Sequence, residues 1–246
     1  MNAMLSLTHH WAHHDHPGDL PGRLLLLDWP SPRVVGILAN TPSPISGRHP
    51  VEAMHQTARD FLRRQRGSSP PEDVLFGLVH ALEAELSVMR QAAGADDWDS
   101  LWDFGGHLAL AATDGSRVSV ARAGDVRVVG IGDVSAVIHT ENTLAAELEA
   151  SGRSLEEGQV SKIVTAYVGG AQLPSDLVRQ VDIRGARTLV FCALGGARRP
   201  SLESLATVCL EPGHANPARA ILDASASQGA AGTVGVCVVE ISRDAI

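Results

Sequence analysis

Histidine and aspartate side chains are concentrated near the start of the chain, in the run His9–His16 (HHWAHHDH) and just after it. Imidazole and carboxylate groups at this density are ligands for Zn²⁺, Ni²⁺ or Cu²⁺. A solvated terminal segment that binds metal only adventitiously has the same composition. We favour that interpretation because mobile ligands lose conformational entropy on binding. The candidate metal ligands here are His13, His14, Asp15, His16 and Asp19.

Other residues that could carry catalysis lack the pattern that would identify a site. Cys192, Cys209 and Cys237 each lie in an apolar run without CxxC spacing, which indicates buried free thiols rather than a disulfide or a zinc site. The sequence contains no Gly-x-Ser-x-Gly nucleophile motif and no glycine-rich phosphate-binding loop. The many serines and histidines therefore single out no nucleophile.

The charge balance narrows the classes of partner. The chain has 28 acidic and 20 basic residues, a net charge of −8 with neutral histidines. Such a chain lacks the basic field that attracts nucleic acid or an anionic membrane surface. No apolar run approaches the roughly 18 residues of a membrane span, and the N-terminus lacks the pattern of a secretory leader. We expect a soluble, cytoplasmic protein with neither nucleic acid nor membrane as partner.

The apolar pattern of the first hundred residues predicts the elements that would position a site. Residues 1–21 are expected to be an irregular, His-rich segment, and residues 22–246 to form a single domain. Proline suits the first turn of a helix, and serine suits the N-cap. Two strands, Arg23–Trp29 and Arg33–Ala39, are expected to precede two helices that begin near Pro50 and Ser69.

After residue 104 the apolar period changes from 3.6 to 2, which predicts strands. Four consecutive strands separated by short turns read as a meander of hairpins. Helices and strands then alternate to the end, an order that suggests two sheets packed face to face with helices outside. The strands of the meander are His107–Ala112, Arg117–Ala121, Val126–Ile131 and Ser135–His139; the later strands are Val178–Ile183, Arg187–Cys192 and Thr233–Ile241; helices are expected over Thr143–Ala150 and Ser201–Val208 and from Asn216.

The stretch Val118–Gly152 resembles the centre of the metal-dependent, type-2C Ser/Thr protein phosphatase family. Gly124-Asp125-Val126-Arg127 is similar to the family's Gly-Asp-Ser-Arg, and Thr140–Asn142 stands at its Leu-Thr-x-Asp-His segment. Further segments follow in the family's order, so the resemblance covers roughly residues 22–241. These segments are Val34–Gly47, Ile163–Gly170, Ile183–Gly196 and Gly229–Val239.

The resemblance implies an α/β (α+β) fold, a four-layer α-β-β-α sandwich of two mainly antiparallel sheets flanked by helices. It also implies a pair of Mn²⁺ or Mg²⁺ ions held by aspartates at strand ends, which activate a water for phosphoester hydrolysis. This chain departs from that ligand set. Asn40 stands at one aspartate position, Leu194 at a second and Ala231-Gly232 at the Asp-Asn pair, whereas Asp125 is retained.

These departures predict no catalytic residue, no dinuclear metal site and no expected cofactor. The resemblance then implies a catalytically inactive pseudophosphatase, a regulatory module that binds another protein: a kinase, a phosphoprotein or an operon partner. The alternative is a divergent Mn²⁺- or Mg²⁺-dependent phosphatase with a rearranged metal site. In that alternative Asp125, Asn40 and the N-terminal His and Asp residues would replace the lost carboxylates.

Overall fold

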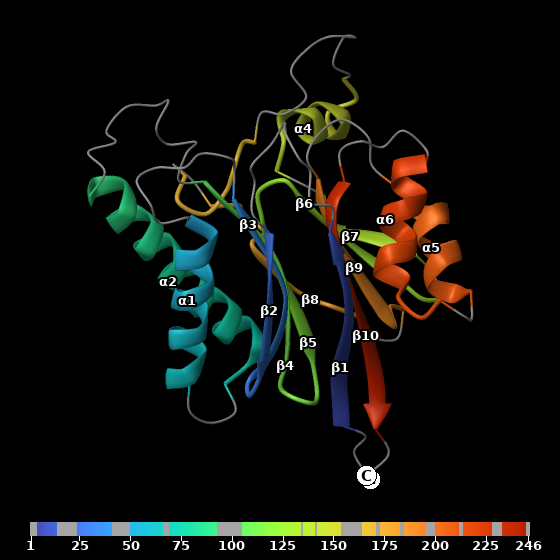
Figure 1. Ribbon diagram of the computed structural model, residues 1–246, viewed down its shortest axis with the longest axis horizontal. Coiled ribbons are helices and arrows are strands. Elements are labelled where there is room, and N and C mark those ends of the chain that lie inside the picture. The colour runs from blue at the N-terminus through green and yellow to red at the C-terminus, as the bar shows by residue number, and fades with distance from the viewer. Residues whose placement is uncertain are drawn as a thin grey trace.

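The computed structural model describes thirteen stretches of the chain (Figure 1). They contain two five-stranded sheets stacked face to face. The described residues are 4–13, 24–40, 50–65, 69–92, 105–133, 135–140, 142–153, 164–170, 173–182, 185–194, 200–211, 214–227 and 233–244.

The first sheet is built from strands that are far apart in the sequence. Its order is β1-β10-β9-β6-β7, and all neighbouring strands are antiparallel. Both chain ends therefore meet in this sheet, because β1 pairs with β10 along its full length. The strands are β1 (Met4–His13), β10 (Thr233–Asp244), β9 (Thr188–Leu194), β6 (Val126–Ile131) and β7 (Ala136–His139).

The second sheet has the order β2-β3-β4-β5-β8 and is also antiparallel throughout. Its central strands β4 and β5 are buried at every residue, because one face packs on helices and the other on the first sheet. The strands are β2 (Leu24–Pro30), β3 (Arg33–Asn40), β4 (Gly106–Thr113), β5 (Val118–Ala123) and β8 (Val178–Gln180).

Helices cover the outer face of each sheet, which completes the four layers (Figure 1). Helices α1 (Pro50–Arg64) and α2 (Pro71–Ala92) pack on the second sheet, and α5 (Leu202–Leu210) and α6 (Pro217–Ser227) on the first. The short helix α4 (Leu144–Ala150) lies at one end of the sandwich. The expected α-β-β-α sandwich of two antiparallel sheets is confirmed.

Three apolar layers hold the sandwich together. One lies between α1, α2 and the second sheet, one between the two sheets, and one between the first sheet and α5 with α6. Aliphatic side chains dominate each layer, as the low aromatic content requires. Full burial of one such side chain stabilises the fold by about 1.5–3 kcal/mol.

Two sequence-based expectations are wrong. Residues 1–21 are not irregular throughout, because Met4–His13 forms β1, with Leu5 and Leu7 buried against the other sheet. The four central strands are not one meander, because β5 and β6 belong to different sheets. The chain crosses from one sheet to the other at Gly124-Asp125. A Gly-Asp pair between two strands is equally typical of a hairpin turn, so the sequence does not distinguish the two.

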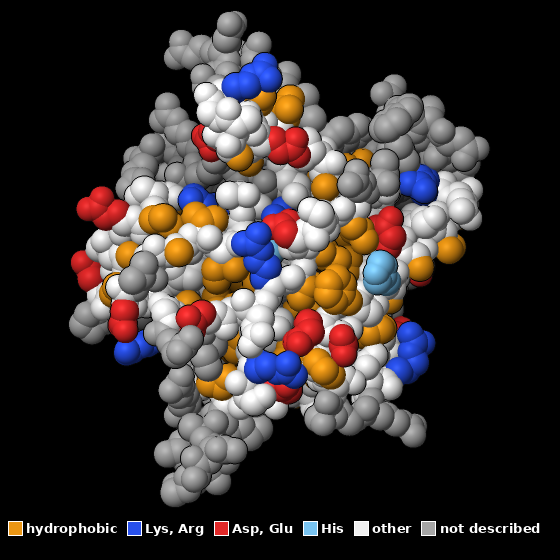
Figure 2. All heavy atoms as spheres, turned by 180° about the vertical axis from the view of Figure 1, so that it is seen from behind, with side chains coloured by type: hydrophobic (Ala, Val, Ile, Leu, Met, Phe, Trp, Pro, Cys, Tyr) orange, Lys and Arg blue, Asp and Glu red, His pale blue; other side chains and the backbone are white. Residues whose placement is uncertain are grey.

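The described surface carries both signs of charge. Seen from behind, basic and acidic side chains are interspersed around exposed apolar groups rather than gathered into one patch of a single sign (Figure 2). Within the described stretches, no helix has the length and apolar character that crossing a membrane requires.

Candidate functional site

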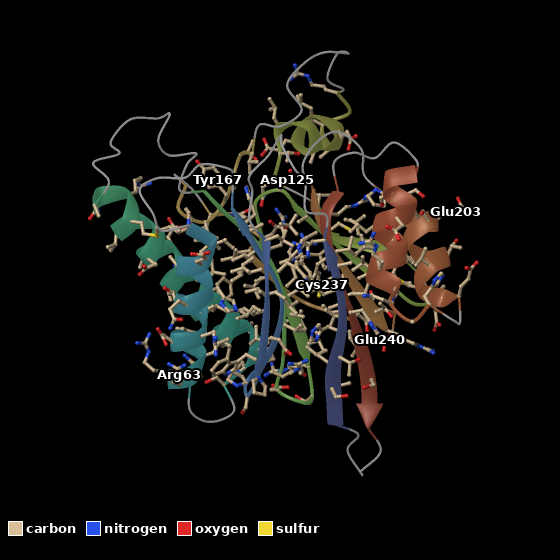
Figure 3. The ribbon with its side chains drawn as sticks, viewed as in Figure 1. Arg63, Asp125, Tyr167, Glu203, Cys237 and Glu240 are labelled. Atoms are coloured by element: carbon tan, nitrogen blue, oxygen red, sulfur yellow. The ribbon has the colours of Figure 1, made fainter. Side chains whose placement is uncertain are left out.

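The strand registers bring the predicted site positions to one end of the sandwich. Asn40 is the last residue of β3 and pairs with Gly106, at the start of β4. Leu194 is the last residue of β9 and pairs with Thr233, which follows Ala231 and Gly232. Asp125 lies at this same end, because the residue after it, Val126, pairs with Ala193. Figure 3 shows Asp125 at the end of the sheets, close to Tyr167.

The histidine candidates are only partly placed. His13 is the last residue of β1, is exposed, and pairs with Gly235, which puts it at the same end as Leu194 and Thr233. Its ring stacks on Trp11, with ring centroids 5.0 Å apart. Six of the candidate residues lie outside the described part of the chain: His14, Asp15, His16, Asp19, Ala231 and Gly232.

Both backbone polar groups of Gly124, where the chain crosses between the sheets, are hydrogen-bonded. The Gly124 N–H donates to the Ala166 carbonyl at 2.9 Å and to Asn142 Oδ1 at 3.2 Å. Its carbonyl accepts from the N–H groups of Asn142 and Val126, both at 2.9 Å. Gly124 has φ of +86°, a left-handed conformation that favours glycine. The turn that presents Asp125 is therefore fixed by the segments around it.

A buried histidine lies directly beneath this turn. The Asp125 N–H donates to His107 Nδ1 at 3.1 Å, so the neutral ring carries its proton on Nε2. Burial lowers the pKa of His107 to about 4, which keeps the ring neutral at physiological pH. A Cβ at Gly124 would lie only 2.0 Å from His107 Nδ1. Glycine is therefore required here for space as well as for conformation.

Helix α2 anchors the segment on the other side of the turn. Gly106 and Val168 exchange two backbone hydrogen bonds of 2.7 and 2.9 Å, so the 164–170 segment is bonded to β4. Glu83 accepts from the Gly169 N–H at 2.6 Å, and Arg90 donates to the Gly169 carbonyl at 3.0 Å. Burial raises the pKa of Glu83, while the Gly169 hydrogen bond acts against that shift.

Sequence reasoning missed the residues that shape this end of the sandwich. His107 and Glu83 belong to no sequence motif, because their hydrogen-bond partners are distant in the sequence. Asp125 is 18 residues from His107, and Gly169 is 86 residues from Glu83. Asn142 belongs to a segment that resembles the family, but the sequence does not indicate that its side chain and backbone both bind Gly124. The only sequence feature that indicates this site is Gly124-Asp125, a glycine and an acidic residue between two apolar strands.

The residue types at this end do not fit a pair of divalent cations. Mn²⁺ and Mg²⁺ require several oxygen ligands, and carboxylates must offset the repulsion between the two ions. Asn40 offers a neutral amide, and Leu194, Ala231 and Gly232 have no side-chain donor. Of the positions that match the family's aspartates, Asp125 alone brings a carboxylate. Among the described residues, no group of three or more His, Cys, Asp or Glu side chains could hold a metal ion.

Comparison with solved structures identifies the fold. The Ser/Thr phosphatase PstP/Ppp of Mycobacterium tuberculosis superposes with a TM-score of 0.67 at 17% identity, over 96% of this chain and 98% of that one. PppA of Pseudomonas aeruginosa, a regulatory component of the type VI secretion system (T6SS), gives 0.71 at 18% identity over 98% and 99%. Stp1 of Staphylococcus aureus gives 0.72 at 12% identity over 100% and 97%. The PstP catalytic domain has also been solved with two manganese ions.

Sequence comparison gives no further assignment. No protein-family model matches the chain, and no curated protein matches it either. At 12–18% identity, the likeness to the three phosphatases concerns the fold, and it extends over nearly the whole of each chain. The chain has the fold of the bacterial type-2C Ser/Thr phosphatases.

Proposed function

We propose that this chain is a pseudophosphatase: a type-2C phosphatase fold that lacks the dinuclear metal centre and acts by binding another protein. The observation that carries the proposal is the shared location of Asn40, Leu194 and Thr233, the residue that follows Ala231-Gly232 in the sequence. The registers of β3, β9 and β10 bring them to the end where Asp125 lies. Their residue types remove the charge that two metal ions would need.

The scaffold around the lost centre supports a binding role. Both backbone polar groups of Gly124 are hydrogen-bonded, and His107 accepts from the Asp125 N–H beneath the turn. A surface fixed in this way loses little conformational entropy when a partner binds. The partner would be a Ser/Thr kinase, a phosphoprotein or another component encoded with this chain, bound without turnover.

A divergent phosphatase is the second candidate. Asp125 is retained, and His13 lies at the same end of the first sheet as Leu194. A fold relative, the catalytic domain of PstP, has been solved with two manganese ions. In this alternative, Mn²⁺ would be held by a rearranged ligand set that includes Asp125.

Restoring the carboxylates tests the proposal on the metal side. The variant that combines Asn40→Asp, Leu194→Asp and Ala231→Asp returns three aspartates to the predicted positions. The matched control combines Leu194→Asn and Ala231→Asn and leaves Asn40 in place, so that it adds polar groups without charge. Calorimetric titration of Mn²⁺ into metal-stripped protein should give binding at least 10-fold tighter for the aspartate variant than for wild type or control. Micromolar binding by the wild type would contradict the proposal.

The binding role has its own test. Proteins captured by the wild-type chain are compared with those captured by Asp125→Arg, which alters the proposed surface. Asp133→Arg is the control, because Asp133 is exposed in the β6–β7 turn at the opposite end of β6. We expect a specific partner that is lost with Asp125→Arg and retained with Asp133→Arg. Equal capture by both variants would place the binding surface elsewhere.

A further inference from the structure

A partly buried polar cluster joins the two sheets where β7 and β8 form their edges. The carboxylate of Asp176, just before β8, lies 3.2 and 3.3 Å from Arg122 Nη2 on β5 and 3.2 Å from Arg179 Nη2 on β8. It also lies 3.4 Å from Nδ1 of His139, the last residue of β7. Arg179 Nη1 donates to the Ile138 carbonyl on β7 at 3.1 Å. These contacts connect the second sheet to the edge strand of the first.

His139 is the titratable group at the centre of this cluster. Its side chain is fully buried, and neither ring nitrogen makes a well-formed hydrogen bond with a described residue. The charged groups that face it are Arg122 from β5, Asp176 from the loop before β8, and Arg179 from β8. Burial, with a further contribution from Arg122, lowers the pKa of His139 to about 4. The ring is therefore neutral in the closed arrangement.

The cluster lies close to the Gly124 crossing on both chain segments. Arg122 precedes Asp125 by three residues, and its N–H donates to the Leu177 carbonyl at 3.0 Å. His139 precedes Asn142 by three residues, and Asn142 holds Gly124 through backbone and side chain. Opening of this edge would therefore occur within three residues of the candidate site, both at the end of β5 and after β7.

We propose that Arg122, His139, Asp176 and Arg179 form an acid-sensitive latch, which holds the β8 edge, from Asp176 to Gln180, against β5 and β7 and opens when His139 is protonated. A protonated imidazole would be a third cation around one carboxylate, and its ring is buried although Asp176 and Arg179 are partly exposed to solvent. Opening the edge hydrates the imidazolium and relieves its repulsion with the two guanidinium groups. This inference does not depend on whether the chain binds metal or a partner.

The size of the effect follows from linkage. A histidine with a pKa of about 4 in the closed edge and 6.5 in the open edge raises the open population about 20-fold between pH 7 and pH 5. The Arg122 N–H, bonded to the Leu177 carbonyl, reports opening of the β5–β8 side. The Leu5 N–H, bonded to the Gly115 carbonyl on the opposite side of the sandwich, reports opening far from the latch.

Amide hydrogen exchange measured by NMR tests the latch, with rates corrected for the intrinsic pH dependence of exchange. From pH 7 to pH 5, protection of the Arg122 amide in the wild type should fall about 20-fold, while that of Leu5 changes much less. His139→Gln places a neutral amide near Asp176 that cannot titrate, and should reduce the change at Arg122 to under about 2-fold. His214→Gln removes an exposed histidine and should behave as wild type.

Three results would overturn the inference. One is an undiminished loss of Arg122 protection in His139→Gln, which would assign the acid effect to another group. The second is an equal loss at Arg122 and Leu5 in the wild type, which would indicate global unfolding. If His139→Gln does not fold, the pKa of His139 is read directly from its ring proton shifts in the wild type. A value near 6.5 is the third contrary result.

Discussion

At the residue scale, the candidate site depends on a contact between a glycine and a histidine. Gly124 adopts a left-handed conformation, and the ring of His107 occupies the space where any other residue would place its Cβ. The glycine was visible in the sequence, whereas its steric partner was not. His107 is a single histidine at the start of an apolar strand, and the sequence does not indicate that its ring packs against Gly124. Residue type therefore predicted the turn, and only packing revealed why the turn tolerates no side chain.

Replacing Gly124 by alanine separates the two requirements. In Gly124→Ala the alanine would have to adopt a left-handed backbone conformation, and its Cβ would clash with His107. We therefore expect this variant to lower the free energy of unfolding by about 3 kcal/mol or more. Gly152→Ala is the matched control, because Gly152 also has a positive φ, of +74°, but has open space where a Cβ would lie. Gly152→Ala should lower the free energy of unfolding by only about 1 kcal/mol.

Urea unfolding followed by circular dichroism measures both variants. Equal costs for Gly124→Ala and Gly152→Ala would mean that the backbone conformation alone matters, and that His107 moves aside at little cost. A cost at Gly124 that falls when His107 is also replaced by alanine would confirm the steric contact.

At the element scale, most strands and helices could be predicted from apolar periodicity, but their pairing could not. The registers of β2 with β3 and of β4 with β5 follow from short turns between strands that are adjacent in sequence. The pairing of β1 with β10 joins the two ends of the chain, and no local signal indicates it. The His-rich composition of β1 suggested a solvated terminus, because only Leu5 and Leu7 alternate in the expected way. Pairing with β10, near the other end of the sequence, stabilises β1 as a strand, although the local sequence of β1 does not favour one secondary structure.

The structural role of β1 gives a direct prediction. Leu7 is buried between the sheets, and Leu7→Ala should lower the free energy of unfolding by about 2–4 kcal/mol. Thr8, the next residue, is exposed, and Thr8→Ala should change it by less than about 0.5 kcal/mol. Chemical denaturation of both variants provides the measurement. Similar small effects at the two positions would mean that residues 4–13 contribute little as a strand.

At the scale of the whole molecule, two buried histidines make the sandwich sensitive to acid. Burial lowers the pKa values of His107 and His139 to about 4, whereas both would titrate near 6.5 in the unfolded chain. The unfolded state therefore binds more protons between pH 6.5 and pH 4, and stability falls as the pH falls through that window. Glu83, whose pKa burial raises, acts in the opposite direction.

The predicted loss is measurable. From pH 7 to pH 5, each histidine should reduce the free energy of unfolding by roughly 2 kcal/mol. Urea unfolding at a series of pH values, for the wild type and for His139→Gln, gives the contribution of one histidine by difference. A wild-type stability that is flat from pH 7 to pH 5 would contradict the buried, neutral state of both rings.

The sequence pattern predicted the whole-molecule architecture better than the site. Residues that resemble the phosphatase family recur in order along the chain, and the solved phosphatases confirm the four-layer fold. Asn40 and Leu194 follow apolar strands and could be assigned to a strand end from sequence alone. Their convergence on the end where Asp125 lies depends on long-range registers between β3, β4, β9 and β10.

The proposed absence of phosphoester hydrolysis at this end of the sandwich can be tested directly. Metal-stripped wild-type protein is supplied with millimolar Mn²⁺ and a mixture of phosphoserine and phosphothreonine peptides, and released phosphate is measured against a protein-free control. We predict a rate indistinguishable from the control, because Asn40, Leu194 and Ala231-Gly232 supply no carboxylate to hold the two ions. Mn²⁺-dependent phosphate release that is lost in Asp125→Asn would contradict the account and establish an active, rearranged metal site.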